Sequence, residues 1–598
     1  MTKTPQEPIR RLLVANRGEI AVRIIRAARD RGVTSIAIYS EPDEGSKFVR
    51  LADVTVPLAG SAAAETYLNI DAILAAAKSS GADAVHPGYG FLSENAAFAE
   101  AVLAEGLTWI GPSPDAIRAL GDKVTARKIA IEVGAPLAPG TPNPVNGHED
   151  VEAFAREHGL PLAIKAAYGG GGRGIKIARK FEDIPELFRS ATREAELAFG
   201  RGECFVERYL EHPRHVETQI LADSHGNVIV VGTRDCSVQR RFQKLVEEAP
   251  APFLTSAQEA SMRQASRDIA RAAGYVGAGT VEFLVGGDGL VSFLEVNTRL
   301  QVEHPVTEET TGIDLVNEQL NIAEGKPLSV LQDPIPSGHS IEFRINSEDP
   351  ASGFLPHPGE IRRLVFPEGP GVRIDSGIEQ GSTIGDHYDS LQAKIIVTGR
   401  DRQHALQRAR RALAEVVIDG VPTVVPFHRS ILEEPAFTAN DGKYGIYTNW
   451  VDHEWVNTLP PQDTDASLKD EYRETETVVL IVNGKKVEVL IPLEFLAMEA
   501  GQPRQTEENT PRSIVQEADA QESAAGESIK APMAGAVTRI EVATGDILEQ
   551  GAVVAVMEIM KMEHPVLATS KCTVREIYVE PGQTLAKHEP IIRVESLI

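Results

Sequence analysis

The chain has 598 residues, of which 42% are hydrophobic, and a formal net charge of -26. At a prior of about 150 residues per domain, this length predicts roughly four domains, each large enough to bury its own core. The strongly acidic balance argues against nucleic acid or an anionic membrane surface as the principal partner.

Cysteine content and apolar segments indicate the compartment. Cys204, Cys236 and Cys572 are too few and too scattered for a disulfide framework or a zinc knuckle, which fits a reducing environment. Residues 1–11 have no apolar core of signal-peptide length, and no apolar run approaches the roughly 20 residues of a membrane span. We therefore expect a soluble cytoplasmic protein.

The first part of the chain alternates strand and helix patterns. A strand pattern at 12–15 is followed by a helical pattern at 19–31 and a second strand pattern at 35–39, which predicts a doubly wound, largely parallel sheet. The segment after the first strand has one glycine, Gly18, which argues against a nicotinamide site. The loop at 86–91 follows another strand, and its spacing is equally consistent with a structural turn and with a site.

A glycine-rich loop follows the next notable strand. Lys165 ends the apolar strand that begins at Leu162, and the loop then contains Gly169, Gly170, Gly171, Gly172, Arg173 and Gly174. Such a loop can place backbone N–H groups against phosphate oxygens, with Lys165 and Arg173 supplying positive charge. A flexible linker is the alternative, but the closely bracketing strands and cations favour phosphate binding.

Acidic residues come at the ends of two apolar strands further on. Glu282 and Glu295 lie on strands joined by a glycine-rich turn at 286–289, so a hairpin directs both carboxylates and Asn297 toward one cavity. Oxygen ligands of this kind suit Mg²⁺ or Mn²⁺ that bridges ATP phosphates. Carboxylate pairs are more often part of a solvated surface, but the apolar flanking strands favour a site.

The region beyond Gly338 contains three kinds of segment. It is strand-rich up to about residue 450, with a helix expected at 402–415, and residues 474–496 predict a hairpin around Asn483-Gly484. Residues 501–527 have almost no large apolar side chains, which predicts a disordered tether. A flexible chain of about 27 residues spans roughly 30 Å, which suits a moving carrier domain.

The C-terminal segment repeats itself. Aligning Gly545 with Gly582, a shift of 37, superposes Val537 on Val574 and Leu548 on Leu585, and Lys561 lies between the halves. Each half reads as short strands with alternating apolar residues, which predicts a flattened barrel that presents a lysine on a hairpin. A solvated surface lysine is the simpler reading. Methionines on both sides of it favour a recognised site.

Two family resemblances follow from these motifs. Met560-Lys561-Met562, the preceding glutamate and Ala531-Pro532-Met533 resemble the biotinyl domains of biotin-dependent carboxylases, although that family usually has alanine or serine where this chain has Ile559. Residues 10–450 resemble the ATP-grasp biotin carboxylases, with a departure at Phe242, where several bacterial relatives have histidine. The motifs that carry the second resemblance are Gly121-Asp122-Lys123, Lys165 with the glycine loop, Glu207-Arg208-Tyr209-Leu210 with His215, Arg234-Asp235-Cys236-Ser237 leading to Gln239 and Lys244, Glu295 through Pro305, and Arg344-Ile345-Asn346.

The second resemblance implies a role for each matched residue. ATP would be held by Lys123, Lys165, Gly170, Gly171, Gly172, Gly174, Glu207, Leu210 and His215, and the metal by Glu282, Glu295 and Asn297. Glu303 would be the general base that deprotonates bicarbonate, and Arg344 would stabilise the biotin enolate. Bicarbonate would be held by Arg299, Gln301, Val302 and Lys244.

The resemblance also implies a fold class, α/β multidomain, and a domain order. This order is a Rossmann-like domain at 1–122, an ATP-grasp domain at 123–337 with a lid at about 138–208, a C-terminal α+β domain at 338–452, a small docking or linker domain at 453–500, the flexible tether at 501–527, and an all-β flattened-barrel biotinyl domain at 528–598.

The whole arrangement resembles the alpha subunit of actinobacterial acyl-CoA carboxylases. It would use ATP and bicarbonate to carboxylate biotin attached to Lys561, and would deliver carboxybiotin to a separate carboxyltransferase beta subunit acting on acetyl-CoA or propionyl-CoA. A biotin protein ligase would be a further partner, in a hetero-oligomer without nucleic acid or membrane. The alternatives are a carrier scaffold with a silent ATP-grasp fold and a single-chain ligase for a small amine.

Overall fold

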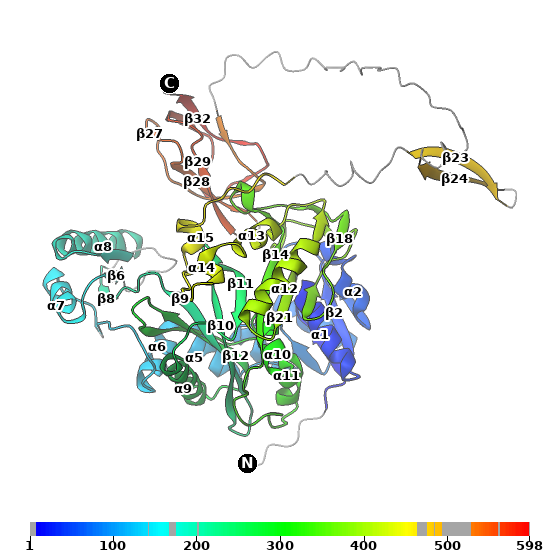
Figure 1. Ribbon diagram of the computed structural model, residues 1–598, viewed down its shortest axis with the longest axis horizontal. Helices are drawn as coiled ribbons and strands as arrows, with labels where there is room; N and C mark the ends of the chain where they lie inside the picture. Colours follow the sequence, from blue (N-terminus) through cyan, green and yellow to red (C-terminus); the bar gives the residue numbers. More distant parts are fainter. Residues whose placement is uncertain are drawn as a thin grey trace.

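The computed structural model describes residues 8–141, 143–166, 175–199, 202–462, 475–482, 485–492, 528–559 and 562–596 (Figure 1). Three predicted features, namely the glycine loop at 169–174, the tether at 501–527 and Lys561, lie outside this part of the chain. Within the part that is described, no helix combines the length and the apolar character needed to cross a membrane.

The N-terminal part is the expected doubly wound unit. Its five strands are all parallel, in the order β3-β2-β1-β4-β5. The central strand β1 is buried on both faces, which explains its unbroken apolar run. The strands are β1 (Arg11–Val14), β2 (Thr34–Tyr39), β3 (Val54–Pro57), β4 (Ala84–His86) and β5 (Thr108–Trp109). The helices are α1 (Gly18–Asp30), α2 (Lys47–Leu51), α3 (Ile70–Ser80), α4 (Ala96–Ala104) and α5 (Pro114–Gly121).

One antiparallel sheet of eight strands forms the centre of the protein, in the order β13-β12-β9-β10-β11-β14-β21-β19. Its strands are β9 (Arg214–Ala222), β10 (Val228–Arg240), β11 (Gln243–Ala249), β12 (Gly277–Val285), β13 (Val291–Asn297), β14 (His339–Asn346), β19 (Val372–Ser376) and β21 (Leu391–Gly399). The pairing of β11 with β14 joins the expected ATP-grasp region to the expected C-terminal region. Both regions therefore contribute to a single sheet.

Helices pack against this sheet. On the ATP-grasp side these are α6 (Lys123–Glu132), α9 (Ser256–Ala272), α10 (His304–Thr311) and α11 (Leu315–Ala323). On the C-terminal side they are α12 (Arg402–Glu415), α13 (Val425–Ile431), α14 (Pro435–Thr438) and α15 (Trp450–His453). The bounds of α12 are those expected from the sequence.

The region expected to be a lid has a small core of its own. It contains the three-stranded sheet β7-β6-β8, and Figure 1 shows its helices at the left, beside the main body. The elements are α7 (His148–His158), β6 (Leu162–Ala166), β7 (Ile175–Ala178), α8 (Ile184–Phe199) and β8 (Cys204–Arg208). Lys165 lies on β6, directly before the glycine loop.

The hairpin expected at 474–496 is also present. Strands β23 (Thr475–Val482) and β24 (Lys485–Pro492) pair antiparallel, with Val482 opposite Lys485. Outside the central sheet, the remaining short strands form pairs. These are β15 (Glu348–Asp349) with β16 (Leu355–Pro356), β17 (Gly359–Glu360) with β20 (Thr383–Ile384), and β18 (Arg363–Val365) with β22 (Val417–Asp419).

The C-terminal unit confirms the sequence repeat. Two four-stranded antiparallel sheets, β25-β32-β30-β27 and β29-β28-β26-β31, enclose a common core. Equivalent residues of the two halves, such as Val537 and Val574, are both fully buried. The strands are β25 (Ser528–Lys530), β26 (Gly535–Ile540), β27 (Ile547–Leu548), β28 (Val553–Ile559), β29 (Met562–Leu567), β30 (Cys572–Ile577), β31 (Thr584–Leu585) and β32 (Pro590–Ser596). Ile559 and Met562 pair at the end of the β28–β29 hairpin, on either side of the segment that contains Lys561.

Candidate active site

One pocket collects almost every described residue that the sequence predicts for the site. It opens among the N-terminal unit, the lid strands and the central sheet. The predicted residues that line it are Lys123, Lys165, Glu207, Leu210, His215, Lys244, Glu282, Glu295, Asn297, Arg299, Gln301, Val302 and Arg344. Glu303 is fully buried and bonds to two of these lining residues.

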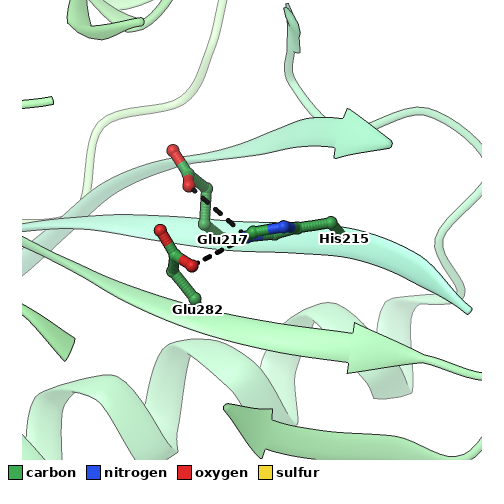
Figure 2. A group of neighbouring side chains, drawn as sticks. All are labelled: His215, Glu217 and Glu282. Atoms are coloured by element: carbon green, nitrogen blue, oxygen red, sulfur yellow. Dashed lines mark ion pairs between the residues drawn. The ribbon is translucent and has the colours of Figure 1, made fainter. Parts of the chain in front are cut away.

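His215 lies between two carboxylates on neighbouring strands. Figure 2 shows its imidazole between Glu217 and Glu282, at nitrogen–oxygen distances of 3.9 and 2.9 Å. Burial is the largest influence on the pKa of His215 and lowers it, but the ion pair and hydrogen bond with Glu282, together with Glu217, outweigh burial and raise that pKa. The other ring nitrogen, Nδ1, lies 2.8 Å from the Gln239 amide nitrogen, so both nitrogens of the imidazole are already engaged.

The residues predicted to hold the metal lie on two paired strands. Glu282 of β12 lies opposite Glu295 of β13, and the Asn297 amide donates to the Glu282 carboxylate at 2.6 Å. Burial raises the pKa of Glu282, but Lys244 and then His215 outweigh it and hold that pKa well below its usual range. These ionised carboxylate and amide oxygens are the donors that Mg²⁺ prefers, so the set fits the metal.

Lys244 is the centre of a buried ionic network. Its Nζ lies 2.8 Å from Glu217, 3.4 Å from Glu282 and 2.5 Å from Glu303. Burial lowers the pKa of this amine, but the acidic side chains around it raise that pKa well above its usual range. On a flat sheet, β11 and β12 would be three strand spacings apart, about 14 Å, so long side chains and sheet curvature bring these charges together.

Glu303 is paired with two cations at once. Its carboxylate accepts from Lys244 at 2.5 Å and from Arg344 at 3.0 Å. Burial raises the pKa of Glu303, but Lys244, Arg344 and Arg234 outweigh it and hold that pKa well below the usual range. In this state Glu303 is ionised but weakly basic. Its basicity would rise if substrates drew Lys244 and Arg344 away.

Two more buried acids, Glu247 and Glu342, lie near Arg344. The guanidinium donates to Glu247 at 2.5 Å, and burial raises the pKa of Glu247 to about 7. Glu342 lies opposite Glu247 on the adjacent strand, and its buried carboxylate oxygens have no hydrogen-bond partner within the described structure. Burial also raises the pKa of Glu342 well above its usual range, so the proton-bearing form is favoured there. The Arg344 guanidinium is thus held by Glu247, and Glu342 lies opposite Glu247 on the neighbouring strand.

Arg299 is oriented by the loop whose role the sequence left open. Its Nε donates to Glu94 at 2.9 Å, and the same carboxylate accepts from the Thr298 N–H at 3.1 Å. The Arg299 Nη1 also donates to Gln301 at 3.1 Å. Glu94 comes three residues after the 86–91 loop, and Tyr89, Gly90 and Phe91 of the loop itself line the pocket, so this region contacts the site and is not only a turn.

The nucleotide side of the pocket is cationic. Lys123, at the first turn of α6, lies 3.1 Å from Glu295, and Lys165 of β6 pairs with Glu207 of β8. These amines face the pocket from different elements, which suits a polyphosphate. The backbone carbonyl of Val302 accepts from the buried Lys394 at 2.7 Å, which fixes the loop before Glu303.

Sequence reasoning missed three buried acids of this site: Glu217, Glu247 and Glu342. Glu217 could have been found, because it is two residues from His215 on the same strand and therefore shares its face. Glu342 offered the same signal, since it is two residues from Arg344 on one strand, whereas Glu247 gave none, because its position depends on the pairing of β11 with β14.

Comparisons with known proteins agree with this geometry. Family models match residues 8–117 ("Biotin carboxylase, N-terminal domain"), 122–331 ("Carbamoyl-phosphate synthase L chain, ATP binding domain"), 342–453 ("Biotin carboxylase C-terminal domain") and 527–594 ("Biotin-requiring enzyme"). These matches support covalent biotin, ATP and Mg²⁺ as the cofactors.

Relatives and solved structures give the same result. Biotin carboxylase 1 of Bacillus subtilis is 46% identical, over 72% of this chain and 97% of that protein. A crystal structure of a Campylobacter jejuni biotin carboxylase complex with β,γ-ATP has a TM-score of 0.67 and 41% identity, covering 74% of this chain and 98% of the other. The biotin-dependent acyl-coenzyme A carboxylase alpha3 subunit of Mycobacterium leprae is 54% identical over 97% of each chain. The chain therefore belongs to the family of biotin-dependent acyl-CoA carboxylase alpha subunits, which join a biotin carboxylase to a biotin carrier domain.

Proposed function

We propose that this subunit carboxylates biotin attached to its own Lys561 and passes the carboxyl group to a separate carboxyltransferase beta subunit, which acts on acetyl-CoA or propionyl-CoA. The observation that carries the catalytic half is the position of Glu303, fully buried and paired with Lys244 and Arg344 next to the pocket. A biotin protein ligase would modify Lys561, and a hetero-oligomer with the beta subunit is the working assembly. The presence of only three cysteines in 598 residues supports the cytoplasm as its compartment.

The pocket residues divide into a nucleotide group and a metal group. Lys123, Lys165, His215 and the Glu207 to Leu210 segment would hold ATP. Glu282, Glu295 and Asn297 would hold Mg²⁺, which when bound neutralises phosphate charge. Attack of bicarbonate oxygen on the γ-phosphate would give carboxyphosphate, a mixed anhydride, with ADP as the leaving group, and lid closure would exclude water from it.

The remaining residues would act on bicarbonate. Arg299, held by Glu94, presents a guanidinium fork that suits a planar anion, and Gln301, Val302 and Lys244 complete its surroundings. Glu303 would take the proton of bicarbonate, which is a poor nucleophile until it is deprotonated. As Lys244 turns toward the bound anions, Glu303 loses its closest cation and becomes a stronger base. Arg344 would then stabilise the negative charge of the biotin enolate, the form of biotin that accepts the carboxyl group.

The proposal separates into two measurable steps. The wild-type chain should hydrolyse ATP in a bicarbonate-dependent manner that free biotin stimulates, whereas a silent scaffold would not. Biotinylated chain should then carboxylate acetyl-CoA or propionyl-CoA only when its co-purified beta subunit is present. Acyl-CoA carboxylation by this chain alone would contradict the division of labour, and absence of ATP hydrolysis would contradict the catalytic assignment.

A further inference from the structure

The biotinyl unit contacts the biotin carboxylase part through a few specific groups. Arg241, in the turn between β10 and β11, donates from Nη1 to the backbone carbonyl of Glu563 on β29 at 3.1 Å. Leu355 of β16 packs against the apolar core of the biotinyl unit. In Figure 1 the strands β28 and β29 lie over the end of the body that carries α13 and α15. We call Arg240, Arg241 and Leu355 the docking surface.

The backbone of this surface is strained. Arg241, Phe242 and Phe354 have φ values of 47°, 66° and 58°, in the left-handed region that favours glycine. Such conformations are energetically unfavourable for residues other than glycine and persist only where the surroundings fix them. Here the Arg241 N–H donates to Asp452 of α15 at 3.0 Å, and the Arg240 guanidinium lies 4.7 Å from the centroid of the Phe354 ring. The two turns are thus locked to the body and to each other.

The biotinyl unit presents a matching face. The Glu563 carboxylate pairs with Arg539 of the same unit at 3.0 Å, and the Glu563 backbone carbonyl accepts from Arg241. The neighbouring His564 side chain is only 3% exposed, and its Nε2 has no hydrogen-bond partner within the described residues. Burial, followed by Arg241 and Arg240, lowers the pKa of His564 to about 4. The ring is therefore neutral at neutral pH, and it can lie beside two arginines without like-charge repulsion.

The contact between Arg241 and Glu563 lies next to the pocket. Phe242, Gln243 and Lys244 follow Arg241 directly in sequence and line the pocket. Glu563 is two residues from Lys561 in sequence. Arg241 therefore holds the carrier close to its modified end, at a turn whose next residues belong to the catalytic cavity.

We propose that the docking surface of Arg240, Arg241 and Leu355 receives the β28–β29 face of the biotinyl unit and determines where the carrier docks for carboxylation. The proposal rests on the function proposed above. It names the partner as this chain's own biotinyl unit, recognised through one backbone carbonyl, one neutral imidazole and one apolar contact. Arg241 and Leu355 act by positioning the carrier and are not catalytic residues.

The test compares two substrates in the full-length biotinylated protein. Arg241→Ala removes the hydrogen bond to Glu563, Leu355→Asp places a charge against the apolar carrier core, and Arg411→Ala is a matched control on an exposed face of α12. Radiolabelled bicarbonate incorporated into the carrier measures docked turnover, and bicarbonate-dependent ATP hydrolysis with free biotin measures the pocket alone.

We expect carrier labelling to slow by about 10-fold or more in both docking variants, which corresponds to about 1.4 kcal/mol. Turnover with free biotin should stay within about 2-fold of wild type. Arg411→Ala should leave both unchanged. Unchanged labelling in both docking variants would overturn the proposal, as would equal losses with carrier and with free biotin, because free biotin needs no carrier docking. Failure of the proposed function would look different, since wild type itself would then show no turnover with free biotin.

Discussion

Replacing Glu303 with glutamine tests the centre of the mechanism. Glu303→Gln keeps the size of the side chain and one carbonyl acceptor, but it removes the negative charge that lies 2.5 Å from Lys244 and 3.0 Å from Arg344. The substituted side chain cannot accept the bicarbonate proton. General-base catalysis contributes about 100-fold or more, so bicarbonate-dependent turnover should fall by at least this factor, which corresponds to about 2.7 kcal/mol of transition-state stabilisation.

The same change should also lower stability, and the two effects can be separated. Breaking a buried ion pair by removing one partner costs about 3–5 kcal/mol, and glutamine, which retains a hydrogen-bond acceptor, should fall near the lower value. Glu248→Gln is a matched control, because Glu248 is equally buried and pairs with Arg402 and His339 outside the pocket. Both variants should show a lower melting temperature, but only Glu303→Gln should lose turnover.

The assay is ATP hydrolysis with saturating free biotin and varied bicarbonate, combined with calorimetric titration of ATP. We expect ATP affinity within a few fold of wild type in Glu303→Gln, because Glu303 does not line the nucleotide side. Near-wild-type turnover would refute the assignment of Glu303 as the base. Equal losses of turnover in Glu303→Gln and Glu248→Gln would show that the effect comes from lost buried charge and not from lost basicity.

Three further changes test other parts of the chain. Lys561→Ala should retain full bicarbonate-dependent ATP hydrolysis with free biotin. It should show no added biotin by intact mass and no acyl-CoA carboxylation with the beta subunit. In the wild-type chain, lipoate at Lys561 or biotin at another lysine would contradict the assignment. Mixing Lys561→Ala with Glu303→Gln chains should partly restore acyl-CoA carboxylation if a carrier reaches a neighbouring chain, and failure would mean that each carrier serves its own chain. Glu94→Ala should raise the KM for bicarbonate by about 10-fold with little change in that for ATP, because Arg299 loses its 2.9 Å partner; a parallel rise in both would contradict a positioning role. Ile559→Ala should destabilise the biotinyl unit by about 2–5 kcal/mol in thermal unfolding, since Ile559 is 2% exposed within its core, and an unchanged melting transition would show that the site repacks.

Local features of the chain were predictable from sequence, and those that depend on strand pairing were not. The helix at 402–415 and the 37-residue repeat follow from short-range periodicity, and the structure confirms both. The sequence shows only that Ile559 stands where the biotinyl family usually has alanine or serine; its side chain points into the core because it occupies an inward position of β28. Glu342 and Glu247 become neighbours only through the pairing of β11 with β14, between segments about a hundred residues apart.

The continuous eight-stranded sheet has a consequence for how the enzyme moves. Glu282 of β12, which we propose as a metal ligand, and Arg344 of β14 belong to different family-model matches, yet backbone pairing through β9, β10 and β11 connects them. A hinge between these two regions would have to break that ladder. We therefore expect this sheet to stay rigid during turnover, with motion mainly in the lid region and in the biotinyl unit. Amide hydrogen exchange should accordingly be slow along β11 and β14, where this ladder crosses the domain boundary that the sequence places between residues 337 and 338.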